Sequence, residues 1–243
     1  MERRALRLEK IRLAILASGS GSTGEVLFDK AVVVITNNQD AHVIERAEKH
    51  GISCKVRMRK DYQTEGKNDP VKYGDELINI FREYEVNFIS QNGWSILTPA
   101  NVVREFEGRI VNAHPAPLDI GHPDFGGQGM HGLAVHAAVL NFAREISRPF
   151  KTEVTLHQVS EKYDEGGVLA FSEVEILPDD TPQKLQDRIK EVEKKQNIDF
   201  WNRVKEFGHL PPVIARPSRL IFPNEVDILK KAKAGAITAF PHG

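Results

Sequence analysis

Apolar, strand-like runs alternate with amphipathic helical segments through the N-terminal half of this 243-residue chain. This alternation is typical of a parallel sheet whose strands are joined by crossover helices. The sequence therefore predicts an α/β fold with a doubly wound, mostly parallel open sheet, Rossmann-type in its N-terminal half. The expected strands cover residues 12–18, 31–37, 54–58, 87–91 and 109–113, and the expected helices cover residues 41–50 and 73–85.

The pattern changes after residue 150. Residues 152–160 and 168–176 read as a pair of strands joined by an acidic, glycine-containing bend. A long amphipathic helix follows, with Thr181 as its N-cap and proline at its first position. We expect one domain over residues 1–205 and a proline-rich C-terminal arm over residues 206–243.

Charge and composition exclude several classes of partner. Lys and Arg number 33 against 34 Asp and Glu, so the net charge of −1 gives no attraction to nucleic acid or to an anionic membrane. The N-terminal ten residues are charged, and the apolar run behind them is too short for a signal peptide or a membrane span. We expect a cytoplasmic protein that acts on small molecules, as a monomer or homodimer. Cys54, in a strand-like run, is expected to pack as a small hydrophobic side chain.

A glycine-rich loop over residues 17–24 follows the first strand. Its glycines match G-x-G-x-x-G, but the second strand ends in Thr36, Asn37 and Asn38 instead of the acidic residue of a dinucleotide site. Residues 24–30 are also too few for the long helix that packs under a pyrophosphate. Backbone N–H groups of residues 19–23 could cradle a single phosphate, and a plain tight turn is the alternative.

Asn112 and His114 lie at the carboxyl end of the fifth strand, where ligands bind in open α/β sheets. Alternation places both side chains on one side of the strand, so an amide and an imidazole can converge on one atom. Pro115 and Pro117 end the strand and stiffen its exit. A strand-end turn around a hydrogen-bonded core histidine is the alternative.

Four histidines fall within a short stretch, which raises the question of a zinc site. They are His114, His122, His131 and His136. Their spacing is irregular and no cysteine accompanies them, so no metal is predicted. Solvated loop histidines and contacts with an anionic substrate both stay open. The segment 131–143 is expected to form a helix that packs its Leu and Val side chains inward.

Taken together, four motifs resemble those of the folate-dependent formyltransferases over residues 11–205. They are SGSGS after the first strand, GWSILTP (93–99), GRIVNAHPAPL (108–118) and TLHQVSEKYDEGGVL (155–169). The resemblance is strongest to the branch that acts on 5'-phosphoribosylglycinamide in purine biosynthesis. It implies transfer of a formyl group from 10-formyltetrahydrofolate, as co-substrate, to the amine of a phosphorylated small molecule.

The resemblance also implies roles for individual residues. Asn112, His114 and Asp164 match the family's catalytic residues, and His157 matches a histidine that positions the aspartate loop. The implied phosphate-binding residues are Gly19, Gly21, Ser22 and Thr23, the implied ribose-binding residue is Glu193, and the implied folate-binding residues are Trp94, Ser95, Leu97 and Asp164.

Formyl transfer requires the residue types found at these positions. The amide of Asn112 can donate a hydrogen bond to the tetrahedral oxyanion. His114 is expected to titrate near neutrality and to move the proton, and Asp164 is expected to raise the pKa of that histidine. The chemistry requires neither a metal nor a covalent intermediate.

The sequence also departs from the family pattern. The helix after the phosphate loop is shortened, Thr23 replaces the usual asparagine, and the segment 121–150 is expanded. The acceptor could therefore be another amine, on an amino sugar or a tRNA, although the tail after Asp164 holds no dense basic patch. Formyltetrahydrofolate deformylase and a non-catalytic nucleotide-binding module are further alternatives. A module without catalytic activity would not require the catalytic candidates to lie together in space.

Overall fold

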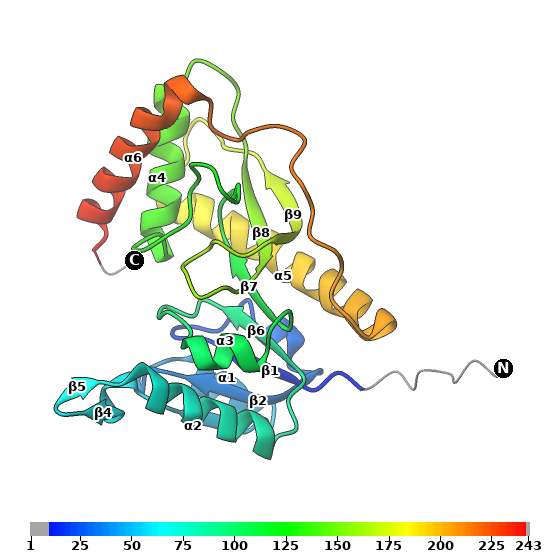
Figure 1. Cartoon of the computed structure of the whole chain (residues 1–243). Coiled ribbons are helices and arrows are strands. Elements are labelled where there is room, and N and C mark those ends of the chain that lie inside the picture. The colour runs from blue at the N-terminus through cyan, green and yellow to red at the C-terminus, as the bar shows by residue number, and fades with distance from the viewer. Residues whose placement is uncertain (1–9, 242–243) are drawn as a thin grey trace.

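The computed structural model describes residues 10–241 (Figure 1). The charged N-terminal segment 1–9, expected to be no signal peptide, lies outside the described residues. The main strands are β1 (Leu13–Leu16), β2 (Ala31–Thr36), β3 (Cys54–Val56), β6 (Phe88–Asn92), β7 (Ile110–His114), β8 (Thr152–Gln158) and β9 (Val168–Val174), and β4 (Gln63–Thr64) and β5 (Lys67–Asn68) form a small hairpin. The α-helices are α1 (Val43–Lys49), α2 (Pro70–Glu83), α3 (Ala100–Glu105), α4 (Gly132–Glu145), α5 (Pro182–Phe207) and α6 (Val226–Ala239).

The central sheet has seven strands in the order β3-β2-β1-β6-β7-β8-β9. Neighbours from β3 to β7 are parallel, whereas β8 pairs antiparallel with both β7 and β9. This confirms the predicted α/β fold with a mostly parallel open sheet and a C-terminal strand pair. Strand order reverses beside β1, so the carboxyl ends of β1 and β6 form the edge at which such folds bind ligands.

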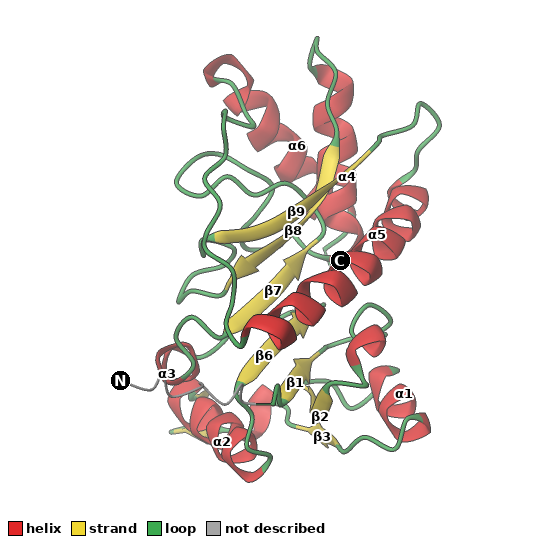
Figure 2. Ribbon diagram, turned by 90° about the vertical axis from the view of Figure 1, so that its right-hand side faces the viewer, coloured by secondary structure: helices red, strands yellow, loops and turns green. Residues whose placement is uncertain are grey.

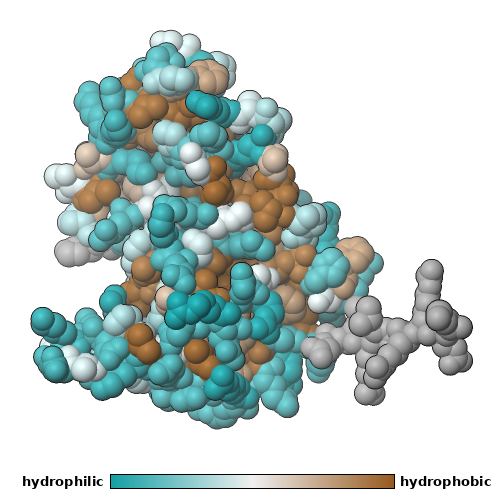
Figure 3. Space-filling view, in the orientation of Figure 1, coloured by the Kyte–Doolittle hydropathy of each residue, from teal (hydrophilic) through white to brown (hydrophobic). Residues whose placement is uncertain are grey.

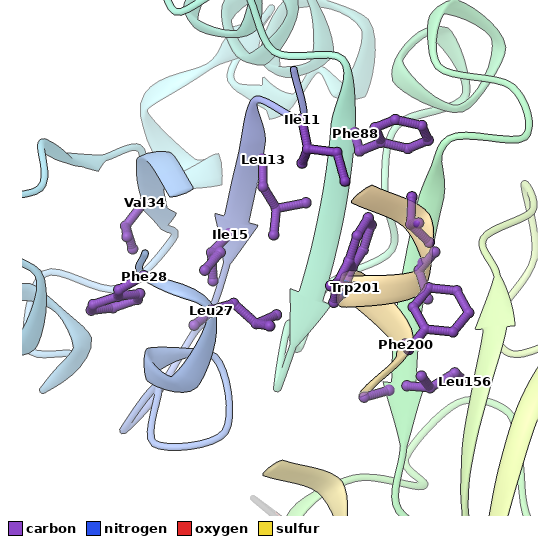
Figure 4. Packing of buried hydrophobic residues seen from close by; sticks show 14 of the residues in the cluster. Ile11, Leu13, Ile15, Leu27, Phe28, Val34, Phe88, Leu156, Phe200 and Trp201 are labelled. Atoms are coloured by element: carbon purple, nitrogen blue, oxygen red, sulfur yellow. The ribbon is translucent and has the colours of Figure 1, made fainter. Parts of the chain in front are cut away.

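Strand alternation divides the core between the two faces of the sheet. Leu13 and Ile15 of β1 point toward α5, where they lie in one cluster with Trp201 (Figure 4). The intervening Ala14 and Leu16 belong to the opposite cluster, formed with α2 and α3. Figure 2 shows the result, with α5 and α1 on one side of the sheet and α2 and α3 on the other. The central parallel strands β1 and β6 are thus buried on both faces.

Helix α5 begins and ends where its sequence signals indicate. The Thr181 hydroxyl accepts a hydrogen bond from the Lys184 backbone N–H at 3.2 Å, and Pro182 occupies the first helical position. Gly208 ends the helix in the left-handed region, at φ 76°. This conformation is available to glycine without a steric penalty. The predicted long C-terminal helix is therefore confirmed with its cap.

Two helices were not predicted. The short α3 follows Pro99, and α6 lies within the stretch 206–243, which was expected to be only a proline-rich arm. Helix α6 packs against α4 through Leu229, Ala232 and Ala236. Its buried face consists mainly of alanine, which gives a weak apolar signal behind a run of prolines. The division at residue 205 stays a prediction.

The surface is of mixed hydropathy, and the environment of the single cysteine does not activate its thiol. In Figure 3 the lower part of the molecule, over α2, is mostly hydrophilic, and apolar side chains gather in the middle and upper part of this face. Cys54 is half-buried, and burial raises the pKa of its thiol to about 11. Within residues 10–241, no helix has both the length and the apolar character needed to cross a membrane.

Helix α6 is expected to unfold together with the sheet because its buried face is continuous with the core of α4. Leu229→Ala should lower the free energy of unfolding by about 2–5 kcal/mol, the range for truncating a buried leucine. Urea denaturation measures this change. The matched control is Leu177→Ala, at a side chain that is 45% exposed, which should change stability little. Two separate unfolding transitions in the wild type would contradict a shared core.

Candidate active site

The glycine-rich loop connects β1 to a single turn of 3-10 helix (Glu25–Leu27), as the short spacing predicted. Gly21 has φ 65°, and a Cβ there would lie 2.3 Å from the Cγ2 atom of Val43, so only glycine fits. The N–H groups of Gly24 and Glu25 bond to the Gly21 carbonyl. Within residues 10–241, the backbone N–H groups of Ser20, Gly21 and Thr23 donate to no protein acceptor. They are thus free to bind an anion.

Asn112 lies in one row with polar residues of both neighbouring strands. Its register partners are Gln91 on β6 and His157 on β8. The Asn112 amide nitrogen is 3.0 Å from Nε2 of His157, and Nδ1 of the same ring is 2.8 Å from the Gln158 carbonyl oxygen. A carbonyl can only accept, so Nδ1 carries a proton and the neutral ring accepts from Asn112 at Nε2. One amide N–H of Asn112 stays available.

His114 is buried at the end of β7, 3% exposed. Its Nε2 atom lies 3.0 Å from the carbonyl oxygen of Phe125, which again can only accept, so Nε2 carries the proton of the neutral ring. The other nitrogen, Nδ1, lies 3.7 Å from Oδ2 of Asp164. It can therefore take up a proton beside a carboxylate that would stabilise the charged ring.

Asp164 occupies a strained position in the loop between β8 and β9. Its φ of 55° lies in the left-handed region, which aspartate tolerates better than most residues. Its Oδ2 atom accepts a hydrogen bond from the Gly127 N–H at 2.8 Å, and its Oδ1 atom lies 3.5 Å from Nε2 of His157. The loop thus directs the carboxylate between both histidines, and the side chain is only 12% exposed.

These contacts determine the charges at the site. Burial favours the neutral form of Asp164, but His114, His157 and the Gly127 N–H together hold the pKa of the carboxyl well below its usual range. Burial lowers the pKa of His114, and the opposing effect of Asp164 does not restore it. The expectation that His114 titrates near neutrality under the influence of Asp164 is therefore wrong. At neutral pH the site holds a carboxylate beside a neutral imidazole.

A small open pocket lies beside this cluster. Asn112, His157 and Asp164 line it, together with Trp94 and Leu97. These last two, with Asp164, are among the residues expected to bind folate. The fourth, Ser95, donates its backbone N–H to the Ser18 hydroxyl at 2.9 Å and so links this segment to the glycine-rich loop.

Glu193, the predicted ribose-binding residue, projects from α5 against the glycine-rich loop. It is 5% exposed, and burial raises the pKa of its carboxyl to about 7, although a hydrogen bond with the Thr23 hydroxyl partly opposes this shift. The structure thus brings the predicted ribose and phosphate residues together. At neutral pH the carboxyl can donate as well as accept a hydrogen bond.

The remaining histidines lie apart from this cluster of side chains. His122 and His131 are exposed, as expected of loop histidines, whereas His136 is buried in α4 and burial lowers its pKa to about 3. The described residues contain no group of three or more ligand-type side chains placed to hold a metal.

Sequence reasoning missed the segment 124–127, which supplies partners to both His114 and Asp164. Those partners are backbone groups, which any residue can provide. The only sequence signal was the adjacent pair Gly126 and Gly127. A Cβ on Gly126 would lie 2.8 Å from the Cβ of Asp164, which explains why a glycine is needed there.

The chain is similar to several known proteins. Residues 11–199 match the family model described as formyl transferase. A phosphoribosylglycinamide formyltransferase of Arabidopsis thaliana, named as chloroplastic, is 34% identical over 205 residues, which cover 80% of this chain. The one from Dictyostelium discoideum is 30% identical, and the match covers 77% of this chain and 94% of the relative. The chain spans about 65% of the length of the Arabidopsis relative.

A solved structure has the same fold. The crystal structure of phosphoribosylglycinamide formyltransferase from Streptococcus pneumoniae superimposes with a TM-score of 0.66 at 26% identity. The superposition covers 81% of this chain and 98% of the bacterial one.

Glu193 should make stability depend on pH in a predictable direction. Its pKa is raised in the folded state, from an ordinary 4.5 to about 7, so its contribution is full below pH 4.5 and is lost as pH rises through 7. Replacing it by glutamine removes this loss. Relative to the wild type, Glu193→Gln should gain about 3 kcal/mol of unfolding free energy between pH 4.5 and pH 8, measured by urea denaturation.

The control is Glu191→Gln on the same helix, at a side chain that is 71% exposed. Its stability difference from the wild type should not vary appreciably with pH. A pH-independent difference for Glu193→Gln would show that this carboxyl titrates normally.

Proposed function

Because this chain belongs to the formyl transferase family, we propose that it transfers the formyl group of 10-formyltetrahydrofolate to the amine of 5'-phosphoribosylglycinamide, a step of purine biosynthesis. The observation that carries the proposal is the convergence of Asn112, His157 and Asp164 on one pocket, with His114 directly behind the carboxylate. The names of the relatives and their coverage of the fold support the choice of acceptor.

The two substrates would enter from opposite sides of the cluster. The phosphate of the acceptor would bind the free N–H groups of the glycine-rich loop, with Gly19, Ser22 and Thr23 around it. Its ribose would lie toward Glu193. The pterin would occupy the pocket between Trp94, Leu97 and the Asp164 loop, where apolar and polar groups meet.

Attack of the amine on the formyl carbon creates a tetrahedral oxyanion. The available amide N–H of Asn112 donates to that oxyanion, while its partner His157 fixes the orientation of the amide. The nitrogen of the amine loses a proton and the departing folate nitrogen gains one as the carbon–nitrogen bond breaks. Asp164 accepts the proton through a water, and Nδ1 of His114 lies close enough to share it.

A non-catalytic nucleotide-binding module would not require these side chains around one pocket, so their convergence argues against that alternative. Formyltetrahydrofolate deformylase would use the same cluster with water as the acceptor. The free N–H groups of the glycine-rich loop favour a phosphorylated acceptor over water. The cytoplasmic location stays a prediction, and the plant relatives are named as chloroplastic.

The direct experiment supplies the purified chain with 10-formyltetrahydrofolate and 5'-phosphoribosylglycinamide and measures formylated product by mass spectrometry. Product that depends on both substrates supports the proposal. Release of formate without an acceptor would identify a deformylase. A non-phosphorylated amine used equally well would overturn the assignment of the glycine-rich loop.

Asp164→Asn should reduce kcat by about 10²–10⁴, because it keeps the shape of the loop and removes the charge that accepts the proton. Asn112→Ala should reduce kcat by about 10²–10³, since its amide acts on charge that exists only after attack. Steady-state kinetics should show that the KM for the folate changes far less than kcat in both variants.

Glu165→Gln is the matched control, because Glu165 is the exposed neighbour of Asp164 and its side chain is 58% exposed. It should retain wild-type kinetics. If Asp164→Asn is fully active, or loses activity only because its melting temperature falls below the assay temperature, the catalytic role of Asp164 is refuted.

A further inference from the structure

We propose that Lys233, on helix α6, is a positioning residue that holds the segment 124–127 in the conformation needed by His114 and Asp164. This inference rests on the proposed function. Residues matching the family model end at position 199, so α6 lies beyond the matched region. The site would therefore depend on a helix that the family model does not include.

The ammonium group of Lys233 forms hydrogen bonds with two backbone carbonyl groups of the turn. Its Nζ atom donates to the backbone carbonyl oxygen of Asp124 at 3.0 Å and to that of Gly126 at 2.6 Å. Hydrogen bonds from a charged donor are about twice as strong as neutral ones. These carbonyls belong to the peptide groups 124–125 and 126–127, so the lysine fixes the orientation of the peptide groups on either side of the one that joins Phe125 to Gly126.

The catalytic candidates contact the peptide group between these two, and also the second of the two. The Phe125 carbonyl accepts from Nε2 of His114 at 3.0 Å, and the Gly127 N–H donates to Oδ2 of Asp164 at 2.8 Å. The first contact sets which nitrogen of His114 faces Asp164. The second directs the carboxylate. A shift of the turn would disturb both at once.

Packing around the lysine leaves the turn little freedom. A Cβ on Gly126 would lie 2.7 Å from a methyl carbon of Leu118, and one on Gly129 would lie 3.1 Å from Cδ1 of Ile237. Ile237 is one helical turn after Lys233, so both side chains face the same loop. Figure 1 shows α6 lying along α4, which anchors the helix from its other side.

Lys233 also adds a positive charge close to several other titratable groups. Burial lowers the pKa of Lys233, and the carboxylates of Asp124 and Asp164 oppose that shift. The charges of both carboxylates and of His157 influence the pKa of His114, and His114 influences that of His136 on α4. Removing the positive charge should raise the pKa values of the carboxyls and of His114 together.

The informative variant is Lys233→Met, which keeps the unbranched apolar stem of the side chain and removes the ammonium group. We expect kcat for formyl transfer to fall at least about tenfold, with small changes in both KM values, because displaced catalytic groups lower turnover. The acidic limb of the kcat–pH profile should move to higher pH. Hydrogen exchange at residues 124–127, followed by mass spectrometry, should become faster.

Two further variants separate positioning from packing. Lys231→Met, at an exposed lysine on the same helix, should match the wild type in all three measurements. Lys233→Arg keeps a charged donor and should recover most of the kcat. A merely structural role would lower the melting temperature of Lys233→Met without moving the pH profile.

The outcomes decide separately on this inference and on the proposed function. Unchanged kcat, pH profile and hydrogen exchange in Lys233→Met would overturn the role of the lysine while wild-type turnover upholds formyl transfer. If the wild type transfers no formyl group, the proposed function fails. Hydrogen exchange at residues 124–127 would then still test the role of Lys233. Unchanged exchange in Lys233→Met would show that the lysine does not stabilise this segment.

Discussion

The site depends on keeping the carboxylate of Asp164 charged in a largely enclosed position. An unpaired charge there would cost several kcal/mol, so the surrounding structure must supply donors. The Gly127 N–H provides one at 2.8 Å, and His157 and His114 lie on either side at 3.5 and 3.7 Å. The N–H donor and the two rings come from three different parts of the fold. The arrangement of β7, β8 and the segment 124–127 around one side chain follows from this requirement.

Strand pairing is what brings these parts together. Because β8 runs antiparallel to β7, Asn112 faces His157 directly, and the bend after β8 returns Asp164 to the same place. The remaining half of the site is built from the carboxyl ends of parallel strands. There the glycine-rich loop leaves β1, and the segment containing Trp94 leaves β6 and contacts the loop through Ser18.

The sequence predicted the elements that have strong local signals. Alternating apolar residues marked the strands, and the proline after Thr181 marked the start of α5. Asn112 and His114 were identified because their side chains share one side of a strand end. The sequence could not show that burial outweighs the effect of Asp164 on His114, since that balance depends on how completely the ring is enclosed. The sequence also could not predict the hydrogen bonds with the backbone of Phe125 and Gly127, because any residue type can supply such groups.

The measurement that tests this account most directly is NMR of the wild-type protein, isotopically labelled at histidine and aspartate, across pH 5.5–9. We predict that at pH 7 the His114 ring is neutral with its proton on Nε2, as the Phe125 carbonyl requires, and that the Asp164 carboxyl is ionised over the whole range. A protonated Asp164 at pH 7, or a His114 ring that carries its proton on Nδ1 or is positively charged there, would contradict the account.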